Sequence, residues 1–199
     1  MNYLAHFHIA QYTNTSIPGA LLGDFVKGNQ WQHYPEPEQL GILLHRHIDS
    51  FTDQQVAQLK LNLCFHPTMR RYAGIALDVY FDYLLSQHWP HYHSGSRDDF
   101  ITHCYQQLHN YPLKERALVT ATHMREYDWL THYNDHQQIT GTLKAISRRL
   151  RRPTKLELML DDIDKHSQTI DQAFSELYPL VLKRVIKFVN EFNLESSSH

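Results

Sequence analysis

The chain has 199 residues, of which 42% are hydrophobic and 20% charged, a composition that suits one globular domain and excludes a disordered or fibrous chain. Nineteen lysines and arginines against 21 aspartates and glutamates give a formal net charge of -2, which excludes the positive field of a non-specific nucleic-acid binder. Only two cysteines, no basic apolar leader and no long apolar stretch together predict a cytoplasmic protein with no membrane span and no nucleic-acid partner.

Apolar residues recur at intervals of three and four along almost the whole chain, and only seven glycines and eight prolines interrupt them. This pattern predicts an all-α fold, a helical bundle of about seven to nine helices that forms a single domain over residues 1–199. The predicted helices cover about 2–12, 17–28, 38–51, 68–89, 97–110, 113–133, 136–150 and 154–194. The last is expected to bend near Pro179, because proline cannot donate a backbone hydrogen bond.

The predicted third helix places His45 and Asp49 one turn apart, on the side opposite its apolar stripe. At this spacing the two side chains can hydrogen-bond each other at the surface, or both can ligate one cation. The spacing alone does not decide between an exposed pair and a metal site.

The predicted fourth helix carries Asp78 and Asp82 one turn apart on a stripe of apolar residues. Two carboxylates so placed repel each other, and a buried pair needs a cation, a proton or an arginine to neutralise it. Arg71 lies on the same stripe and offers the alternative without a metal.

Two further segments supply candidate ligands. Asp24 lies between the apolar residues of the predicted second helix, where it is either a hydrogen-bonded core acid or a ligand. His6 on the first helix is a weaker candidate, since a lone histidine on such a helix is more often structural.

Acids and histidines from four helices can thus converge in a bundle as an oxygen- and nitrogen-ligated site that suits Mg²⁺ or Mn²⁺ and hydrolysis. A di-iron bundle normally carries Glu-x-x-His motifs on facing helices, and the sequence has none. It also lacks a P-loop, a G-x-S-x-G motif and a zinc-type cysteine pair, and redox and NTP-driven chemistry are accordingly disfavoured.

Four arginines, Arg148, Arg149, Arg151 and Arg152, fall within five positions of a slightly negative chain. Arginine forks bind phosphates and carboxylates, so this stretch is a candidate docking site for an acidic partner or a phosphate. The alternative is a solvated helix end, which the helix dipole favours.

Several ordered motifs resemble the acyl carrier protein phosphodiesterases of Gram-negative bacteria. They are the opening Met1 to His6, the run Gly23 to Gly28, the block Gly41-Ile42 with His45 to Asp49, Thr52-Asp53, and Leu77-Asp78 with Asp82, Leu85, His88 and Trp89. Tyr127, Trp129-Leu130, Arg151 to Pro153, Asp164 and Tyr178-Pro179 extend the likeness over nearly the whole chain.

The resemblance implies a cytoplasmic hydrolase that removes 4'-phosphopantetheine from holo acyl carrier protein, with Mn²⁺ or Mg²⁺ as cofactor. It also implies a remote likeness to the all-helical HD phosphohydrolases, although the chain has no adjacent His-Asp pair and offers only His45 with Asp49. Asp24 lies in the matching motif and is the first choice for an essential acid.

The resulting hypothesis is that His6, Asp24, His45, Asp49, Asp78 and Asp82 hold one or two divalent cations that activate water against the phosphodiester. Asp24, His45 and His88 are the expected catalytic residues, with His88 or His47 protonating the departing serine. The arginines at 148–152 are expected to bind the acidic carrier protein. The alternatives are an HD-type phosphohydrolase acting on a nucleotide and a non-catalytic helical adaptor.

Overall fold

The computed structural model describes residues 1–152 and 154–196, which form eleven α-helices and four short 3-10 helices and contain no strand. The first part of the chain forms α1 (Tyr3–Tyr12), α2 (Ile17–Leu22), η1 (Gln30–His33), α3 (Glu36–Gln58), η2 (Leu61–Cys64), η3 (Arg70–Tyr72), α4 (Ala73–Gln87) and α5 (Trp89–Tyr92). The rest forms α6 (Arg97–Asn110), α7 (Glu115–Glu126), α8 (Trp129–His132), α9 (His136–Ser147), η4 (Leu156–Leu158), α10 (Met159–Lys165) and α11 (Ser167–Ser196). The predicted all-α fold is confirmed. Pro153 and residues 197–199 of the predicted domain lie outside the described residues.

Several predicted helices are shorter or divided in the structure, including the one over 68–89, where α4 begins only at Ala73, and the one over 136–150, which ends at Ser147. The second ends at Leu22, with Gly23 as its C-cap, rather than at Gly28. The predicted helix over 113–133 is divided at Asp128, which has a left-handed backbone (φ +46°), and the one over 154–194 is divided at His166. The divisions at Asp128 and His166 carry neither glycine nor proline, so residue type alone did not predict them. In contrast, α11 continues past Pro179.

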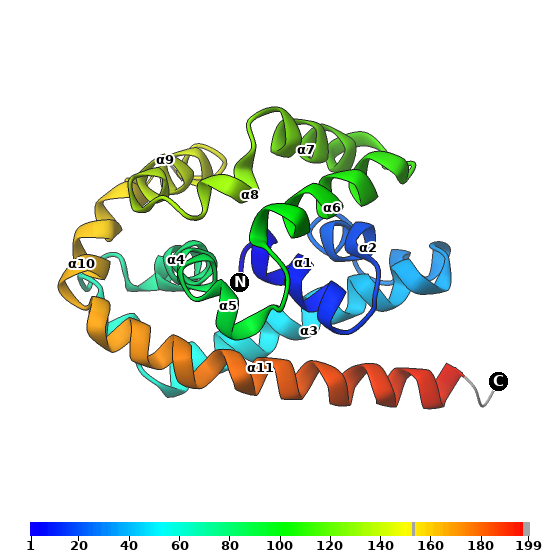
Figure 1. The fold of residues 1–199 in the computed structure, drawn as a ribbon. Coiled ribbons are helices and arrows are strands. Elements are labelled where there is room, and N and C mark those ends of the chain that lie inside the picture. The colour runs from blue at the N-terminus through cyan, green and yellow to red at the C-terminus, as the bar shows by residue number, and fades with distance from the viewer. Residues whose placement is uncertain (153, 197–199) are drawn as a thin grey trace.

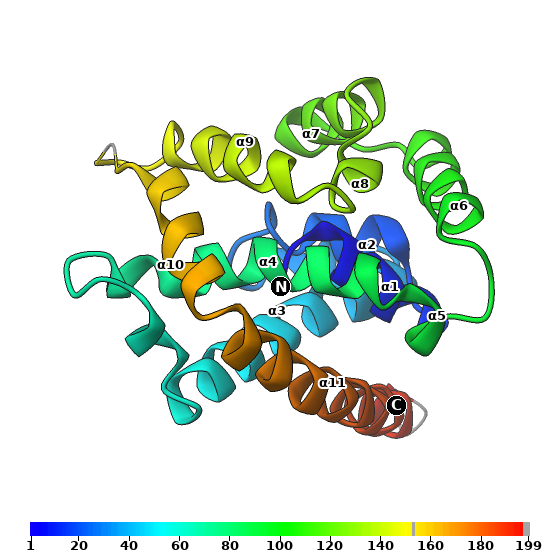
Figure 2. The same cartoon turned by 60° about the vertical axis from the view of Figure 1, so that its left-hand side comes forward.

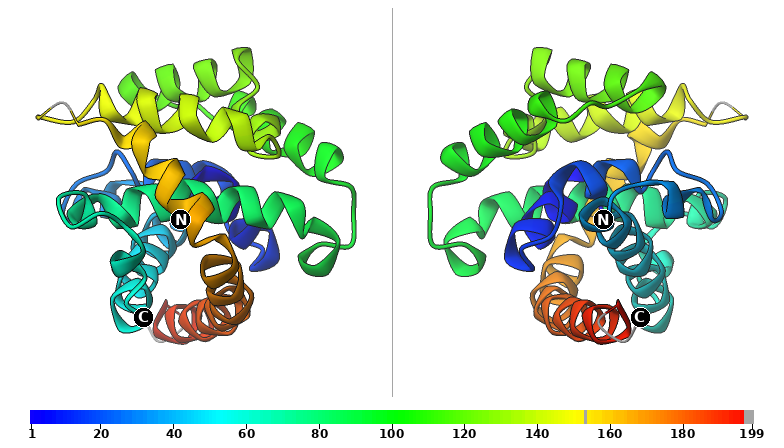
Figure 3. Two further views of the ribbon diagram at one scale, coloured as in Figure 1. Left: turned by 90° about the vertical axis from the view of Figure 1, so that its left-hand side faces the viewer. Right: turned by 90° about the vertical axis from the view of Figure 1, so that its right-hand side faces the viewer.

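The helices lie in three tiers (Figure 1). A central tier contains α1, α2 and α4, the lower tier contains α3 and α11, and α6 to α9 curve over the top (Figures 2 and 3). Because α3 packs against both α2 and α11, two of its faces are covered. None of the helices in the described ranges combines the length and the apolar character that a bilayer-spanning segment requires.

Two glycines let α2 and α3 approach each other closely. A Cβ atom on Gly41 would lie 2.8 Å from the Cα of Gly19, and one on Gly19 would lie 3.0 Å from the backbone of Glu38. No side chain fits between the helices here, so their backbones are in direct contact. This contact fixes the distance between α2 and α3, and with it the position of the turn after α2 relative to α3.

The N-terminal helix α1 is buried along most of its length, from Leu4 to Ala10. The carboxylate of Asp82 accepts hydrogen bonds from the backbone N–H groups of Asn2 (3.2 Å), Leu4 (2.7 Å) and Ala5 (3.3 Å). These N–H groups have no acceptor within the helix, and the positive end of the helix dipole favours an acid beside them. Asp82 therefore fixes α1 against α4.

The buried ring of His8 provides a test of this packing. Tyr178 donates its hydroxyl hydrogen to Nδ1 of His8 (2.8 Å), and Nε2 of His8 donates to the backbone oxygen of Tyr92 (3.1 Å). Burial lowers the pKa of His8 to about 4, so the folded state holds this ring neutral.

We expect the contribution of His8 to the free energy of unfolding to fall as the pH drops from about 6.5 towards 4, because only the unfolded chain binds the proton in that range. Titration of the assigned His8 ring by NMR, together with urea unfolding at pH 7 and pH 5, measures both quantities. A His8 ring that titrates near 6.5 would contradict the described burial.

Candidate metal centre

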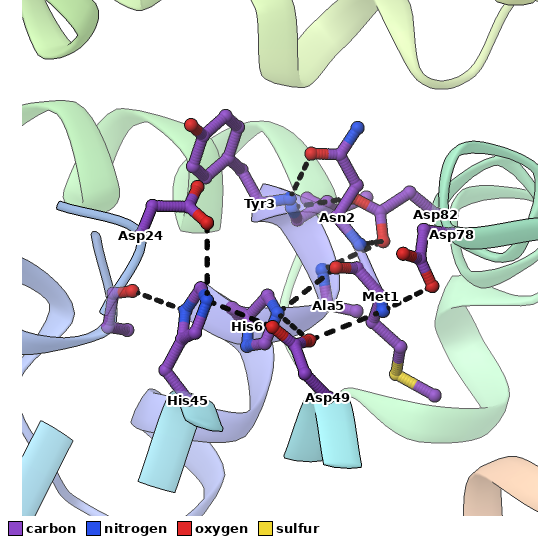
Figure 4. A network of polar contacts seen from close by, with 12 residues as sticks. Met1, Asn2, Tyr3, Ala5, His6, Asp24, His45, Asp49, Asp78 and Asp82 are labelled. Atoms are coloured by element: carbon purple, nitrogen blue, oxygen red, sulfur yellow. Dashed lines mark hydrogen bonds and ion pairs between the residues drawn. The ribbon is translucent and has the colours of Figure 1, made fainter. Parts of the chain in front are cut away.

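A histidine from α1 and a histidine and an aspartate from α3 form one polar group (Figure 4). Donor atoms of His6, His45 and Asp49 all lie within 4.8 Å of one another. Nε2 of His6 is 3.0 Å from Oδ1 of Asp49, and Nε2 of His45 is 3.2 Å from Oδ2. Both histidines are buried, whereas the Asp49 side chain is 42% exposed. Buried imidazoles thus meet a carboxylate that solvent can reach.

The orientation of His45 is fixed by its other ring nitrogen. Nδ1 lies 2.7 Å from the backbone oxygen of Ala20, so it carries the hydrogen and donates it there. In the neutral ring, Nε2 then presents its lone pair to Asp49 and to Asp24, whose Oδ1 is 3.5 Å away. A backbone carbonyl on the far nitrogen is the usual outer partner of a metal-binding histidine.

Gly23 provides the space that His45 occupies. A Cβ atom at Gly23 would lie 2.3 Å from Cγ of His45 and 2.5 Å from its Cβ, so this ring packs directly on the glycine backbone. Gly23, which directly precedes Asp24, therefore has a packing role, because any side chain at this position would clash with the His45 ring. The exposed-pair interpretation of His45 and Asp49 is wrong, because α2 and the turn after it cover His45.

The rings of His6 and His45 stack with their centroids 3.8 Å apart. The pKa values of the two rings are shifted in opposite directions. Burial lowers the pKa of His45, but hydrogen bonds to Asp24 and Asp49 outweigh it and raise the pKa to about 9. Burial and the neighbouring His45 lower the pKa of His6 to about 4. Burial raises the pKa of Asp49, but its bonds to both histidines hold it well below the ordinary value. Without a cation, the stack carries one positive charge.

Tyr3 is a site residue that the sequence reasoning missed. Burial and the neighbouring Asp24 carboxylate raise the pKa of the Tyr3 hydroxyl. The Tyr3 and Asp24 side chains lie next to each other (Figure 4), and both line the cavity over the donors. Burial raises the pKa of Asp24, but its bond to His45 outweighs burial and lowers it, so Asp24 stays ionised. The only sequence signal for Tyr3 was its position three residues before His6, which is too common to be informative.

The partner of Asp78 is the α-ammonium group of Met1 rather than Arg71. The ammonium donates to Oδ1 of Asp78 at 2.6 Å and lies 3.6 Å from Oδ1 of Asp49. Burial lowers the pKa of this amine, but the carboxylates of Asp78 and Asp49 outweigh it and raise the pKa to about 10. Arg71 instead lies over the ring of Tyr72, 4.6 Å from its centroid. The cation that the sequence analysis required beside Asp78 is therefore the N-terminal ammonium group, which also lies close to Asp49.

The other predicted site residues lie apart from the group. Asp82 is fully buried with its oxygens on the N–H groups of α1, so it faces away from the three donors. His88 is exposed at the end of α4, ten residues and therefore about 15 Å along the helix from Asp78. His47 stacks on Phe188 and accepts a hydrogen bond from Arg184, so it faces α11. The assignment of a proton-donor role to His88 or His47 has no geometric support.

The predicted arginines are exposed just beyond the end of α9. The guanidinium of Arg149 lies 5.8 Å from the ring centroid of Trp129, and both residues line a cavity that Asp24 also lines. The structure thus separates Arg149 from Arg148, Arg151 and Arg152, which the sequence pattern grouped together.

The donor set fits a divalent cation. It offers two imidazole nitrogens and several carboxylate oxygens, a mixture that Mn²⁺ accepts and Mg²⁺ accepts with more water. Nε2 of His6 lies 3.0 Å from Oδ1 of Asp49 and 3.0 Å from the backbone oxygen of Met1, while Nδ1 is buried without a partner among the described residues. The cavity over the group has a volume of about 160 Å³, which leaves room for a cation and several waters of about 30 Å³ each.

Two larger cavities meet the group at Asp24. One of about 690 Å³ lies under α8 and α9 and shares Asn2, Tyr3, Asp24 and Ile146 with the cavity over the donors. The other, of about 700 Å³, lies between the loop after α2 and the loop before α7 and shares Asp24 alone. A substrate with two arms can therefore approach the donors from two sides.

Comparison with known proteins gives one consistent result. A family model described as acyl carrier protein phosphodiesterase matches residues 1–181. Proteins with that name from Klebsiella pneumoniae (strain 342) and Photorhabdus laumondii are 32% and 33% identical over 188 and 190 residues, which cover 92% of this chain in both cases and 96% and 94% of the relatives. A relative from Salmonella paratyphi A is 31% identical over 192 residues, or 94% of this chain and 98% of its own. No solved structure matches the chain at a comparable level of significance.

Proposed function

This chain belongs to the acyl carrier protein phosphodiesterase family, and we propose that His6, His45 and Asp49 form the metal centre of its phosphodiester hydrolysis. Its activity is that of a phosphoric diester hydrolase. The proposed substrate is holo acyl carrier protein, and the proposed products are apo carrier protein and 4'-phosphopantetheine. The observation that carries the proposal is the convergence of three donors from two helices beside a cavity that reaches solvent.

The three donors and Asp24 would hold a divalent cation, with Mn²⁺ preferred and Mg²⁺ as the alternative. When bound, such a cation polarises a phosphate oxygen and lowers the pKa of a coordinated water, which are the two needs of phosphodiester hydrolysis at neutral pH. The Ala20 carbonyl keeps Nε2 of His45 directed at the donors throughout. The Met1 ammonium and Asp78 would complete the charge balance beside them.

The leaving serine oxygen needs a proton, and Tyr3 is the proposed source. Tyr3 lines both the cavity over the donors and the cavity under α8 and α9, beside Asp24. Burial and the neighbouring Asp24 raise the pKa of its hydroxyl, so the hydroxyl keeps its proton at neutral pH and has one to give. The Asp24 carboxylate would orient the hydroxyl as its acceptor.

The decisive experiment is mass spectrometry of holo carrier protein after incubation with the enzyme and Mn²⁺. The expected result is loss of the phosphopantetheine mass, which a chelator should prevent. Turnover of a nucleotide panel with no change in carrier protein would favour the nucleotide alternative. The absence of any turnover and of any rise in melting temperature with Mn²⁺ would favour a non-catalytic adaptor.

We propose that Arg148, Arg151 and Arg152 bind the acidic carrier protein. Reversing the charge of Arg148 and Arg151 to glutamate should raise KM for holo carrier protein by about tenfold, since two surface ion pairs together contribute about 1.4 kcal/mol. The effect should shrink with added salt, while turnover of a small aryl phosphodiester stays unchanged. Lys183→Glu on the exposed side of α11 is the matched control. An equal rise in KM for the control would contradict a specific docking surface.

A further inference from the structure

The cavity of about 690 Å³ continues directly from the candidate metal centre. It shares Asn2, Tyr3, Asp24 and Ile146 with the cavity over the donors, so a single ligand can extend from one cavity into the other. Its volume lies within the range of about 300–1,000 Å³ that small-molecule sites occupy. We refer to it below as the α9 groove.

One wall of the α9 groove is a single face of α9. Gln138, Gly141, Thr142, Ala145 and Ile146 line it, at the spacings of three and four residues that share one side of a helix, and Arg149 lines the cavity just beyond the end of α9. From Gln138 to Ile146 the helix advances eight residues, or about 12 Å along its axis. The groove therefore extends along α9.

The remaining lining combines aromatic rings with uncharged and charged polar groups. Tyr127, Trp129 and Tyr133 supply ring surface, and Tyr133 is buried while the other two are accessible. Gln138, Thr142 and Asn2 supply amide and hydroxyl groups, and the same cavity is also lined by Glu126, Asp128, His132 and Arg149. The rings and the uncharged amides and hydroxyls suit a slender ligand that has both methyl groups and amides.

We propose that the α9 groove holds the pantetheine arm of the substrate while its phosphodiester lies at the His6, His45 and Asp49 group. The inference rests on the proposed function of that group. The arm runs about twelve bonds from the phosphate oxygen to the thiol, the equivalent of about four extended residues, or roughly 14 Å. This length is close to that of the lined face of α9, and the amides and geminal methyls of the arm match the amide, hydroxyl and ring groups of the lining.

The cavity of about 700 Å³ on the other side of Asp24 is the rival location. Both cavities are lined by some charged side chains, so charge does not favour either of them for the uncharged arm. The rival cavity, however, shares only Asp24 with the cavity over the donors, whereas the α9 groove shares four residues with it. The arm therefore fits the α9 groove better.

Gly141 allows the groove to be filled without disturbing the fold. A Cβ atom there would meet only Oε1 of Gln138, at 4.0 Å, so a larger side chain extends into open space. Glycine inside a helix is unfavourable by about 0.5–1 kcal/mol relative to alanine, so replacement does not weaken α9. Thr140→Trp adds similar bulk at an exposed position of α9 outside the groove lining and is the matched control.

The test compares wild type, Gly141→Ala, Gly141→Trp and Thr140→Trp on holo carrier protein and on a small aryl phosphodiester that has no arm. We expect Gly141→Trp to lower kcat/KM for holo carrier protein by about 100-fold and to leave the small diester unaffected, because arm binding is then lost. Thr140→Trp should retain activity on both, and Gly141→Ala should lie between wild type and Gly141→Trp on holo carrier protein, because a methyl group fills less of the groove than an indole ring. Free pantetheine should inhibit cleavage by wild type competitively and should not inhibit the residual activity of Gly141→Trp.

Full activity of a folded Gly141→Trp on holo carrier protein would overturn the inference, and so would an equal loss on both substrates. Inhibition by pantetheine that persists in Gly141→Trp would also overturn it and would place the arm in the rival cavity. Failure of wild type to cleave holo carrier protein at all would instead count against the proposed function, whatever the variants do.

Discussion

Replacing Asp49 with asparagine should lower kcat/KM for holo carrier protein by at least about 100-fold and abolish the rise in melting temperature with Mn²⁺. Asp49 is the one residue that contacts both Nε2 atoms of the stack, so its loss removes the bridging anion of the donor set. Even residues that only support a metal ligand typically cost 10–100-fold in metal affinity or activity when they are changed, so a direct ligand should cost more.

Asp53→Asn is the matched control, because Asp53 lies on the same helix one turn later and is exposed. Activity, Mn²⁺ binding by calorimetry and melting temperature with and without the metal should all resemble wild type in this control. Asp49→Asn should fold, because the carboxylate is 42% exposed and an amide can occupy its place. Undiminished Mn²⁺ binding by Asp49→Asn would show that the cation lies elsewhere.

The second large effect is expected from Gly23→Ala, although the added methyl group carries no functional chemistry. It would lie 2.3 Å from Cγ of the His45 ring, well inside contact distance, so His45 or the turn after α2 must move. Overpacking of this kind typically costs 1–3 kcal/mol of stability. Displacement of Nε2 from the donor set should also lower kcat/KM by about 100-fold.

A double-mutant cycle isolates this contact. In a His45→Ala background, Gly23→Ala should cost little further stability, because the ring that it strikes is gone. Gly74→Ala is the control, since a Cβ atom there would meet only Oδ1 of Asp53 at an ordinary 3.4 Å. Urea unfolding and steady-state kinetics of the four variants provide the comparison. Additive losses in the cycle would mean that Gly23 acts independently of His45.

The sequence contained enough to predict the all-α fold and part of the site. Helical spacing identified His45 with Asp49, and the unusual acid in an apolar segment identified Asp24. Periodicity could not show which face of α3 would be covered, because α2 and α11 bury two faces of that helix. His45 thus looked exposed in the sequence and is buried in the structure.

The acids of α4 illustrate the limit of reasoning from spacing. Asp78 and Asp82 lie one turn apart, yet Asp78 binds the Met1 ammonium and Asp82 binds N–H groups of α1. Both partners are backbone groups at or just before the start of α1, and residue type does not reveal such partners. The metal role of Asp82 was inferred from the cost of burying a carboxylate. The N–H groups at the start of α1 offset part of that cost, and burial still raises the pKa of Asp82 to about 7.

The positions of the donor groups and of the α9 groove along the chain have a consequence for how such enzymes diversify. Every group proposed to hold the cation comes from residues 6–49, while the opposite wall of the groove comes from 126–149. Residues in the later stretch can change the fit of an incoming prosthetic group without altering the hydrolytic machinery. Related hydrolases can therefore acquire new substrate preferences by drift in one stretch while their chemistry stays the same.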